Sequence, residues 1–154
     1  MKKTTIVMAF ILFCLAGASA PADVIDPNDP NVINAAINID PDTLNLKSKG
    51  KWITCRIELP EGYDVHDIDV STIMLNGVVP AQPRPVEITD TNGDGVAELM
   101  VKFSRSAVQA LLTPDEETEL IVSGELADGT IFEGTDTIRV IDPGKKNGKG
   151  PKNK

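Results

Sequence analysis

Apolar and polar residues alternate with a period of two through most of residues 35–142, a pattern that predicts β-strands. The clearest segment is WITCRIEL at residues 52–59, and residues 98–103 alternate in the same way. Residues 117–141 form two further alternating segments around Asp128-Gly129, a pair typical of a β-hairpin turn. The side chains expected in the core are Ile53, Cys55, Ile57, Leu59, Leu99, Val101, Phe103, Leu120, Val122, Leu126, Phe132, Ile138 and Val140.

Proline and glycine interrupt this alternation at defined places. Residues 37–46 alternate, but Pro41 divides them, so we expect an edge strand in two halves with Ile37, Ile39, Leu44 and Leu46 facing inward. The pair Asn76-Gly77 predicts the end of the strand that begins near residue 68. The cluster PAQPRP at residues 80–85 delays the next strand until residue 86.

One segment has helical spacing instead. Ala107, Val108, Leu111 and Leu112 share one helical face, with Ser104 or Ser106 as the cap and Pro114 as the stop. Seven or eight short strands with a single short helix predict an all-β fold, an antiparallel sandwich rather than a barrel or an α+β fold.

Residues 40–55, DPDTLNLKSKGKWITC, resemble the opening of immunoglobulin-like modules in bacterial and archaeal surface proteins. The shared features are a proline-broken first strand, a glycine turn and then a core strand. The resemblance implies one immunoglobulin-like β-sandwich and assigns no role to it.

The ends of the chain differ from this central region. Lys2 and Lys3 precede a short apolar run and the small residues AGASA, which predicts a signal peptide at residues 1–20, with cleavage after Ala18, Ala20 or Ala22. We therefore expect a secreted protein, extracellular or periplasmic, with no integral membrane segment after cleavage. The predicted divisions are the signal peptide at 1–20, an extended linker at 21–34, the sandwich domain at 35–142 and a disordered Lys/Gly-rich tail at 143–154.

Charge changes the functional picture. All 23 acidic residues lie between Asp23 and Asp142, against eight Lys and Arg in that span, so the body carries a net charge of −15. Such a surface repels nucleic acid and anionic membranes and accumulates cations. We expect no nucleic-acid partner, and a partner that is a protein or a cell-surface polymer.

The sequence DTNGDGVAE at residues 90–98 carries the most specific chemistry. Asp90, Asn92 and Asp94 offer side-chain oxygens at loop positions one, three and five, Val96 offers its carbonyl at seven, and Glu98 occupies nine. The spacing resembles the calcium loops of dockerins, thrombospondin type 3 repeats and integrin propeller blades. That resemblance implies a structural calcium site.

The alternative is a metal-free turn of Asn, Asp and Gly, whose side chains satisfy themselves. The loop also departs from the EF-hand, because position twelve is Val101 in place of a bidentate glutamate. Glu87 is the carboxylate nearest in sequence that would complete the shell, if it also lies nearby in space.

The remaining chemistry is sparse. His66 has no second His or Cys ligand close by in sequence, and Cys55, the only cysteine left after signal cleavage, is expected to be a core thiol. Trp52 and Tyr63 would make a small platform for a carbohydrate or another ligand. We therefore expect a non-enzymatic structural or adhesive module, with a ligand-binding module or a hydrolase with dispersed catalytic residues as the alternatives.

Overall fold

The structure is a computed structural model that describes residues 29–144. The predicted signal peptide, residues 21–28 of the predicted linker and the tail from residue 145 lie outside the described residues. The strands are β1 (Val32–Asn34), β2 (Ala36–Asp40), β3 (Thr43–Asn45), β4 (Trp52–Glu58), β5 (Ile68–Leu75), β6 (Val79–Pro80), β7 (Glu87–Thr89), β8 (Glu98–Ser104), β9 (Asp115–Leu126) and β10 (Ile131–Ile141). The helices are the 3-10 turn η1 (Val65–Asp67) and α2 (Arg105–Gln109).

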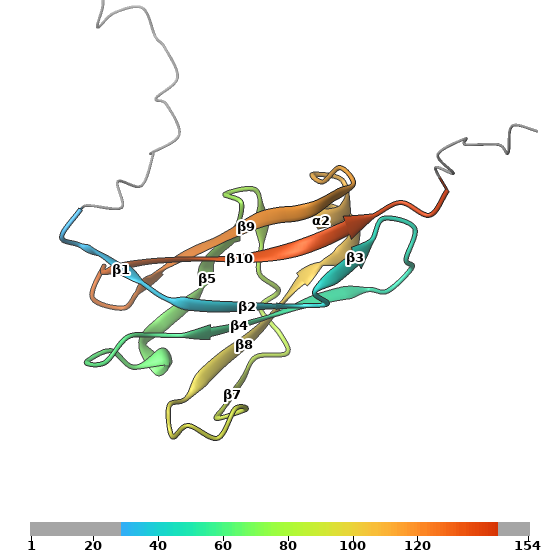
Figure 1. The fold of residues 1–154 in the computed structure, drawn as a ribbon. Coiled ribbons are helices and arrows are strands. Elements are labelled where there is room, and N and C mark those ends of the chain that lie inside the picture. The colour runs from blue at the N-terminus through green and yellow to red at the C-terminus, as the bar shows by residue number, and fades with distance from the viewer. Residues whose placement is uncertain (1–28, 145–154) are drawn as a thin grey trace, which may run out of the picture.

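These strands form two sheets, so the all-β prediction is confirmed (Figure 1). The six-stranded sheet has the order β1-β10-β9-β5-β6, with β3 also paired to β10. The four-stranded sheet has the order β2-β4-β8-β7. The strands number ten rather than seven or eight, because β1 lies in the predicted linker, the first predicted strand is divided into β2 and β3, and the two-residue β6 follows the Asn76-Gly77 turn.

The core lies between the sheets and contains every side chain predicted to face inward along β4, β8, β9 and β10. Alternation explains this, since successive side chains of a strand point to opposite faces. The largest fully buried side chains are Phe103 of β8 and Phe132 of β10. Cys55 of β4 is fully buried, and this burial raises the pKa of its thiol to about 12, as expected for an unreactive core cysteine.

The segment from β1 to β3 pairs with both sheets and adds two parallel pairings to a fold that is otherwise antiparallel, as predicted. β1 and β3 each pair parallel with β10, whereas β2 between them pairs antiparallel with β4. In Figure 1 the segment from β1 to β3 runs along β10. A Cβ atom at Gly134 of β10 would collide with the carbonyl oxygen of Ala35, so glycine permits the close approach at which the chain changes sheets.

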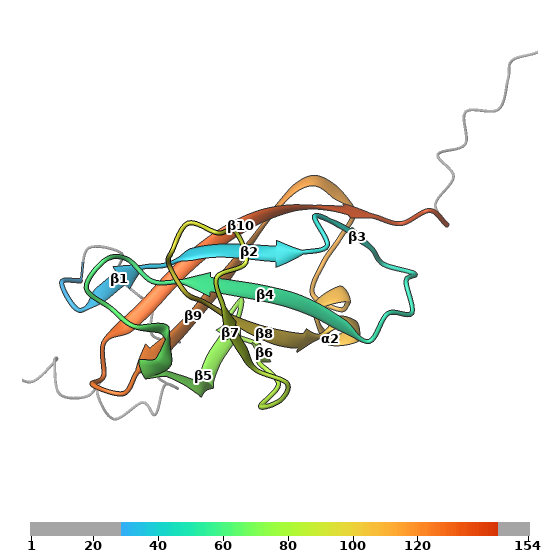
Figure 2. The same cartoon turned by 90° about the horizontal axis from the view of Figure 1, so that it is seen from below.

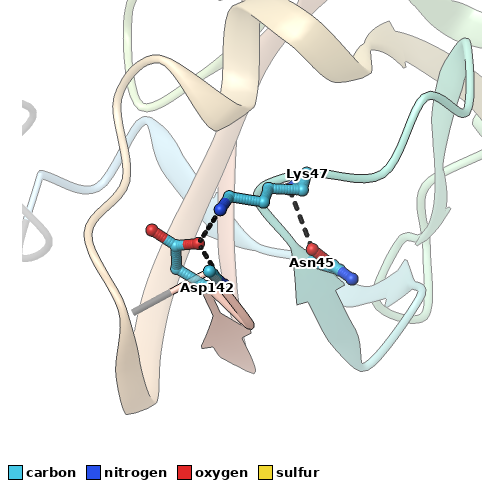
Figure 3. A network of polar contacts seen from close by, with 4 residues as sticks. Asn45, Lys47 and Asp142 are labelled. Atoms are coloured by element: carbon cyan, nitrogen blue, oxygen red, sulfur yellow. Dashed lines mark hydrogen bonds and ion pairs between the residues drawn. The ribbon is translucent and has the colours of Figure 1, made fainter. Parts of the chain in front are cut away.

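The first strand begins earlier than expected, because β1 occupies residues 32–34 at the end of the predicted linker. After β3 an ion pair joins the chain to the residue that follows β10. Lys47 Nζ lies 3.4 Å from Asp142 Oδ1, and the Lys47 amide donates a hydrogen bond of 2.8 Å to Asn45 Oδ1 (Figure 3).

The helix is shorter than its sequence pattern suggests. α2 ends at Gln109, and only Val108 of its predicted apolar face is fully buried, while Leu111 is exposed. Ser104 occupies the N-cap position but its side chain makes no capping hydrogen bond. No helix in residues 29–144 has the length and apolar character needed to cross a bilayer.

Candidate metal site

The predicted ligand loop joins two adjacent strands of the four-stranded sheet, as expected. β7 ends at Thr89 and β8 begins at Glu98, and these two residues are paired across the strands. The intervening loop contains Asp90, Asn92, Asp94 and Val96, all exposed. In Figure 2 this loop crosses in front of one end of β4 as it connects β7 to β8.

Side chains within the loop bind its own backbone. Asp90 Oδ1 accepts a hydrogen bond from the Gly93 amide at 2.6 Å, and its Oδ2 accepts one from the Gly95 amide at 2.9 Å. Asn92 Oδ1 accepts from the Asp94 amide at 2.9 Å, and Asp94 Oδ1 from the Val96 amide at 2.8 Å. A carboxylate oxygen has two acceptor positions, so these bonds leave each aspartate with capacity to bind a cation.

Gly95 has the conformation that the loop pattern requires. Its φ of +91° lies in the left-handed region, where a side chain would be strained. Gly95 is position six of the loop, where an EF-hand loop also has a glycine for its sharp turn.

Glu98 is the unusual member of the set. Its exposed fraction is 8%, and it is the only charged residue that is buried in the part of the chain described. Its Oε2 atom is buried and has no hydrogen-bond partner among residues 29–144. A buried carboxylate oxygen without a hydrogen-bond partner is costly, because it loses its hydration and gains no hydrogen bond in exchange.

Strand register explains where Glu98 lies. Leu99 is fully buried in the core, so the preceding side chain points to the outer face of the four-stranded sheet. The sequence correctly predicts this outward direction but not the burial. Thr91 and Asn92 of the loop lie over the same part of the outer face, since they line one surface cavity of about 370 Å³ together with Glu98.

The structure adds a second glutamate, Glu58 at the end of β4, which the sequence analysis missed. Ile57 is paired with Leu99, so the next position along β4 brings Glu58 opposite Glu98 on the outer face. Glu58 lines the same cavity. Desolvation and then the carboxylates of Asp94, Glu98 and Asp90 raise the pKa of Glu58, while the nearby Asn92 side chain acts to lower it.

Alternation alone places Glu58 on the outward face of its strand. Its proximity to the loop depends on the pairing of β4 with β8, whose residues lie about 40 positions apart, so no local signal identifies it. Glu87 of β7, which we expected to complete the ligand shell, is exposed and is paired with Met100 of β8. Since Met100 is two residues beyond Glu98 on β8, Glu87 lies on the neighbouring strand in the next row of side chains.

A positive side chain also borders the cavity. Arg56 lies on the same face of β4, and its Nη1 donates to Asn38 Oδ1 at 3.3 Å. Within residues 29–144 no ion pair joins Arg56 to Glu58 or Glu98. In the same residues no three His, Cys, Asp or Glu side chains stand in position to hold a metal ion as they are folded. The carboxylates of the loop and of Glu98 therefore do not converge on one point as they are folded.

The other candidate residues are dispersed. Trp52 begins β4 and lies 4.9 Å from Lys51 Nζ, measured from the ring centroid, whereas Tyr63 follows the other end of the strand. Six residue steps of β-strand separate the two ends by about 20 Å, so the two rings do not form a single platform. His66 is exposed, with its Nδ1 2.6 Å from Asp64 Oδ1.

Comparison of the chain with protein-family models, with curated proteins and with solved structures finds no match.

Proposed function

We propose that the protein is a secreted, non-enzymatic β-sandwich module whose loop at residues 90–98 binds a structural calcium ion. In this proposal Asp90, Asn92, Asp94 and Glu98 supply side-chain oxygens and Val96 supplies its carbonyl. Calcium prefers six to eight such oxygen ligands. The observation that carries the proposal is the buried, unpartnered Oε2 atom of Glu98 beneath a loop rich in carboxylates.

The ion would supply a positively charged partner for Glu98, which has no ion pair among residues 29–144. A divalent cation compensates a desolvated carboxylate and joins the loop to the first residue of β8, so the loop becomes part of the sheet. Extracellular modules commonly bind calcium with a Kd of about 10⁻⁴ to 10⁻³ M. The net charge of −15 on the body favours this binding because it concentrates cations near the surface.

We further propose that the sandwich is immunoglobulin-like. Support comes from the strand order, in which β2-β4-β8-β7 corresponds to strands A, B, E and D of an immunoglobulin constant domain. The opposite sheet corresponds to strands G, F, C and C′ in the order β10-β9-β5-β6. The fold does not identify the partner, and we propose that it is a protein or a cell-surface polymer.

A structural role for the ion fits the site better than a catalytic one. Loop and strand oxygens would occupy most of the coordination sphere, which leaves little room for a substrate or an activated water. The single histidine belongs to η1, is exposed and is paired with Asp64. It lines a surface cavity with Gly95 and Val96 of the loop, and this cavity is separate from the one that Glu98 lines.

The test is the melting temperature of the purified mature protein, with calcium titrated against EGTA and with magnesium as the control. At free calcium near 100 times the Kd, linkage adds about 2.7 kcal/mol to the free energy of unfolding. For a domain of this size, that corresponds to a rise on the order of 10 °C. An absent rise, or an equal rise in magnesium, would contradict the proposal.

A further inference from the structure

We propose that Glu58 of β4 is an additional ligand of the same ion, so that calcium bridges the loop, β8 and β4. This inference rests on the proposed calcium site and names the residue that completes it. It assigns to Glu58 the role that the glutamate at position twelve has in an EF-hand loop.

The first argument is the position of the two glutamates. Ile57 of β4 is paired with Leu99 of β8, so the same register places Glu58 opposite Glu98. Ala36 of β2 and Thr89 of β7, each paired with one of the glutamates, complete the row across the sheet. Residues directly opposite on antiparallel strands have Cβ atoms about 4.5 to 5.5 Å apart. Two carboxylates at this separation can share one cation.

The second argument is the charge of this row. Like charges directly opposite each other destabilise a sheet. Neither glutamate has an ion pair in the part of the chain described, and Asp90 and Asp94 add further negative charge nearby. The Arg56 guanidinium lies one row away and is hydrogen-bonded to Asn38. A cation between Glu58 and Glu98 removes the repulsion that the chain itself leaves uncompensated.

The third argument is the absence of a competing ligand at position twelve. Val101 occupies that position, and its side chain is fully buried in the core on the opposite face of β8. Glu87 is paired with Met100, so it lies in the row next to that of Glu98 and not opposite it. Glu58 lines the surface cavity with Asn92 and Glu98, so it is the carboxylate outside the loop that the fold delivers to the site.

The experiment measures calcium affinity by isothermal titration of calcium chloride into the mature protein and three variants. Glu58→Gln removes the proposed ligand. Glu87→Gln removes the same charge from the neighbouring row and serves as the matched control. Glu58→Asp keeps the charge but shortens the side chain, which separates direct coordination from the general electrostatic field.

We expect the Kd to rise at least tenfold in Glu58→Gln and several-fold in Glu58→Asp, and to change less than twofold in Glu87→Gln. In EGTA the melting temperature of Glu58→Gln should equal or exceed that of the unmodified protein, because the repulsion of Glu98 is relieved. A residue that merely supported the fold would instead lower the melting temperature in both conditions.

Three results would overturn the inference. If the unmodified protein binds calcium and Glu58→Gln binds it equally well, Glu58 is not a ligand, although the loop site stands. If the two Gln variants weaken binding equally and Glu58→Asp does not, Glu58 acts only through its charge. If the unmodified protein binds no calcium, the proposed function fails as well.

Discussion

Two polar turns with similar composition connect antiparallel strands in this protein, and only one of them lies beside a buried carboxylate oxygen that has no hydrogen-bond partner among residues 29–144. The turn between β9 and β10 contains Asp128 and Gly129, and Asp128 Oδ1 accepts a hydrogen bond of 2.9 Å from the Thr130 amide. The Leu126 amide donates to the Thr130 carbonyl at 2.8 Å, which closes the hairpin. This turn satisfies itself, and Asp128 is exposed.

The loop between β7 and β8 has two hydrogen bonds of this type, from the Asp94 amide to Asn92 and from the Val96 amide to Asp94. Asp90 accepts two further bonds from more distant amides of the loop. The loop differs in what lies beside it, because it adjoins the buried carboxylate of Glu98 and approaches Glu58. An Asp/Gly-rich turn is therefore a candidate metal site because of the partners that the fold brings to it, and composition alone does not distinguish the two cases.

The largest expected effect comes from removing the first loop ligand. Asp90→Ala should abolish most of the calcium-dependent stabilisation, about 2.7 kcal/mol at free calcium near 100 times the Kd. It also deletes the acceptor for the Gly93 and Gly95 amides, so a smaller loss should appear in EGTA. Thermal melts in calcium and in EGTA measure both effects. A melting temperature in calcium equal to that of the unmodified protein would contradict the prediction.

A smaller effect with opposite signs in the two conditions is expected for Glu98→Gln. The change removes a buried charge without a partner, so stability in EGTA should rise by about 1 kcal/mol. The same change should reduce the calcium-dependent rise, because a ligand charge is lost. Denaturant unfolding in the two buffers tests the crossover. A loss of stability in EGTA would show that the carboxylate already has a partner.

The smallest effect is expected in the self-sufficient hairpin and should not depend on calcium. Hydrogen bonds from the backbone amide and then from the side chain of Thr130 lower the pKa of Asp128 below its usual value. A lowered carboxyl pKa contributes stability above the unfolded-state value near 3.9, and this contribution is lost as the pH falls through the folded-state pKa. Asp128→Asn keeps the acceptor oxygen but does not titrate.

The melting temperature of Asp128→Asn should therefore fall less steeply below about pH 4 than that of the unmodified protein, in calcium and in EGTA alike. A calcium-dependent difference between the two proteins would contradict the conclusion that the turn between β9 and β10 does not depend on an ion.

Much of the fold followed from local pattern. Alternation identified the core faces of β4, β8, β9 and β10, and Asn76-Gly77 and Asp128-Gly129 marked two turns whose residues have positive φ at Asn76, Gly77 and Gly129. Pro41 correctly indicated a divided first strand. Local pattern did not show that its pieces pair with different sheets or run parallel to β10, because that pairing joins residues nearly 100 positions apart.

The sequence by itself determined which residues alternate, where the chain turns, and that one loop has oxygens at calcium-ligand spacing. These properties depend on neighbouring residues and on the two-residue period of a strand. Only the tertiary structure decided that Glu98 is buried, that Glu58 rather than Glu87 stands opposite it, and that Trp52 and Tyr63 lie at opposite ends of β4. The physical reason is register, since long-range strand pairing sets which side chains meet across a sheet.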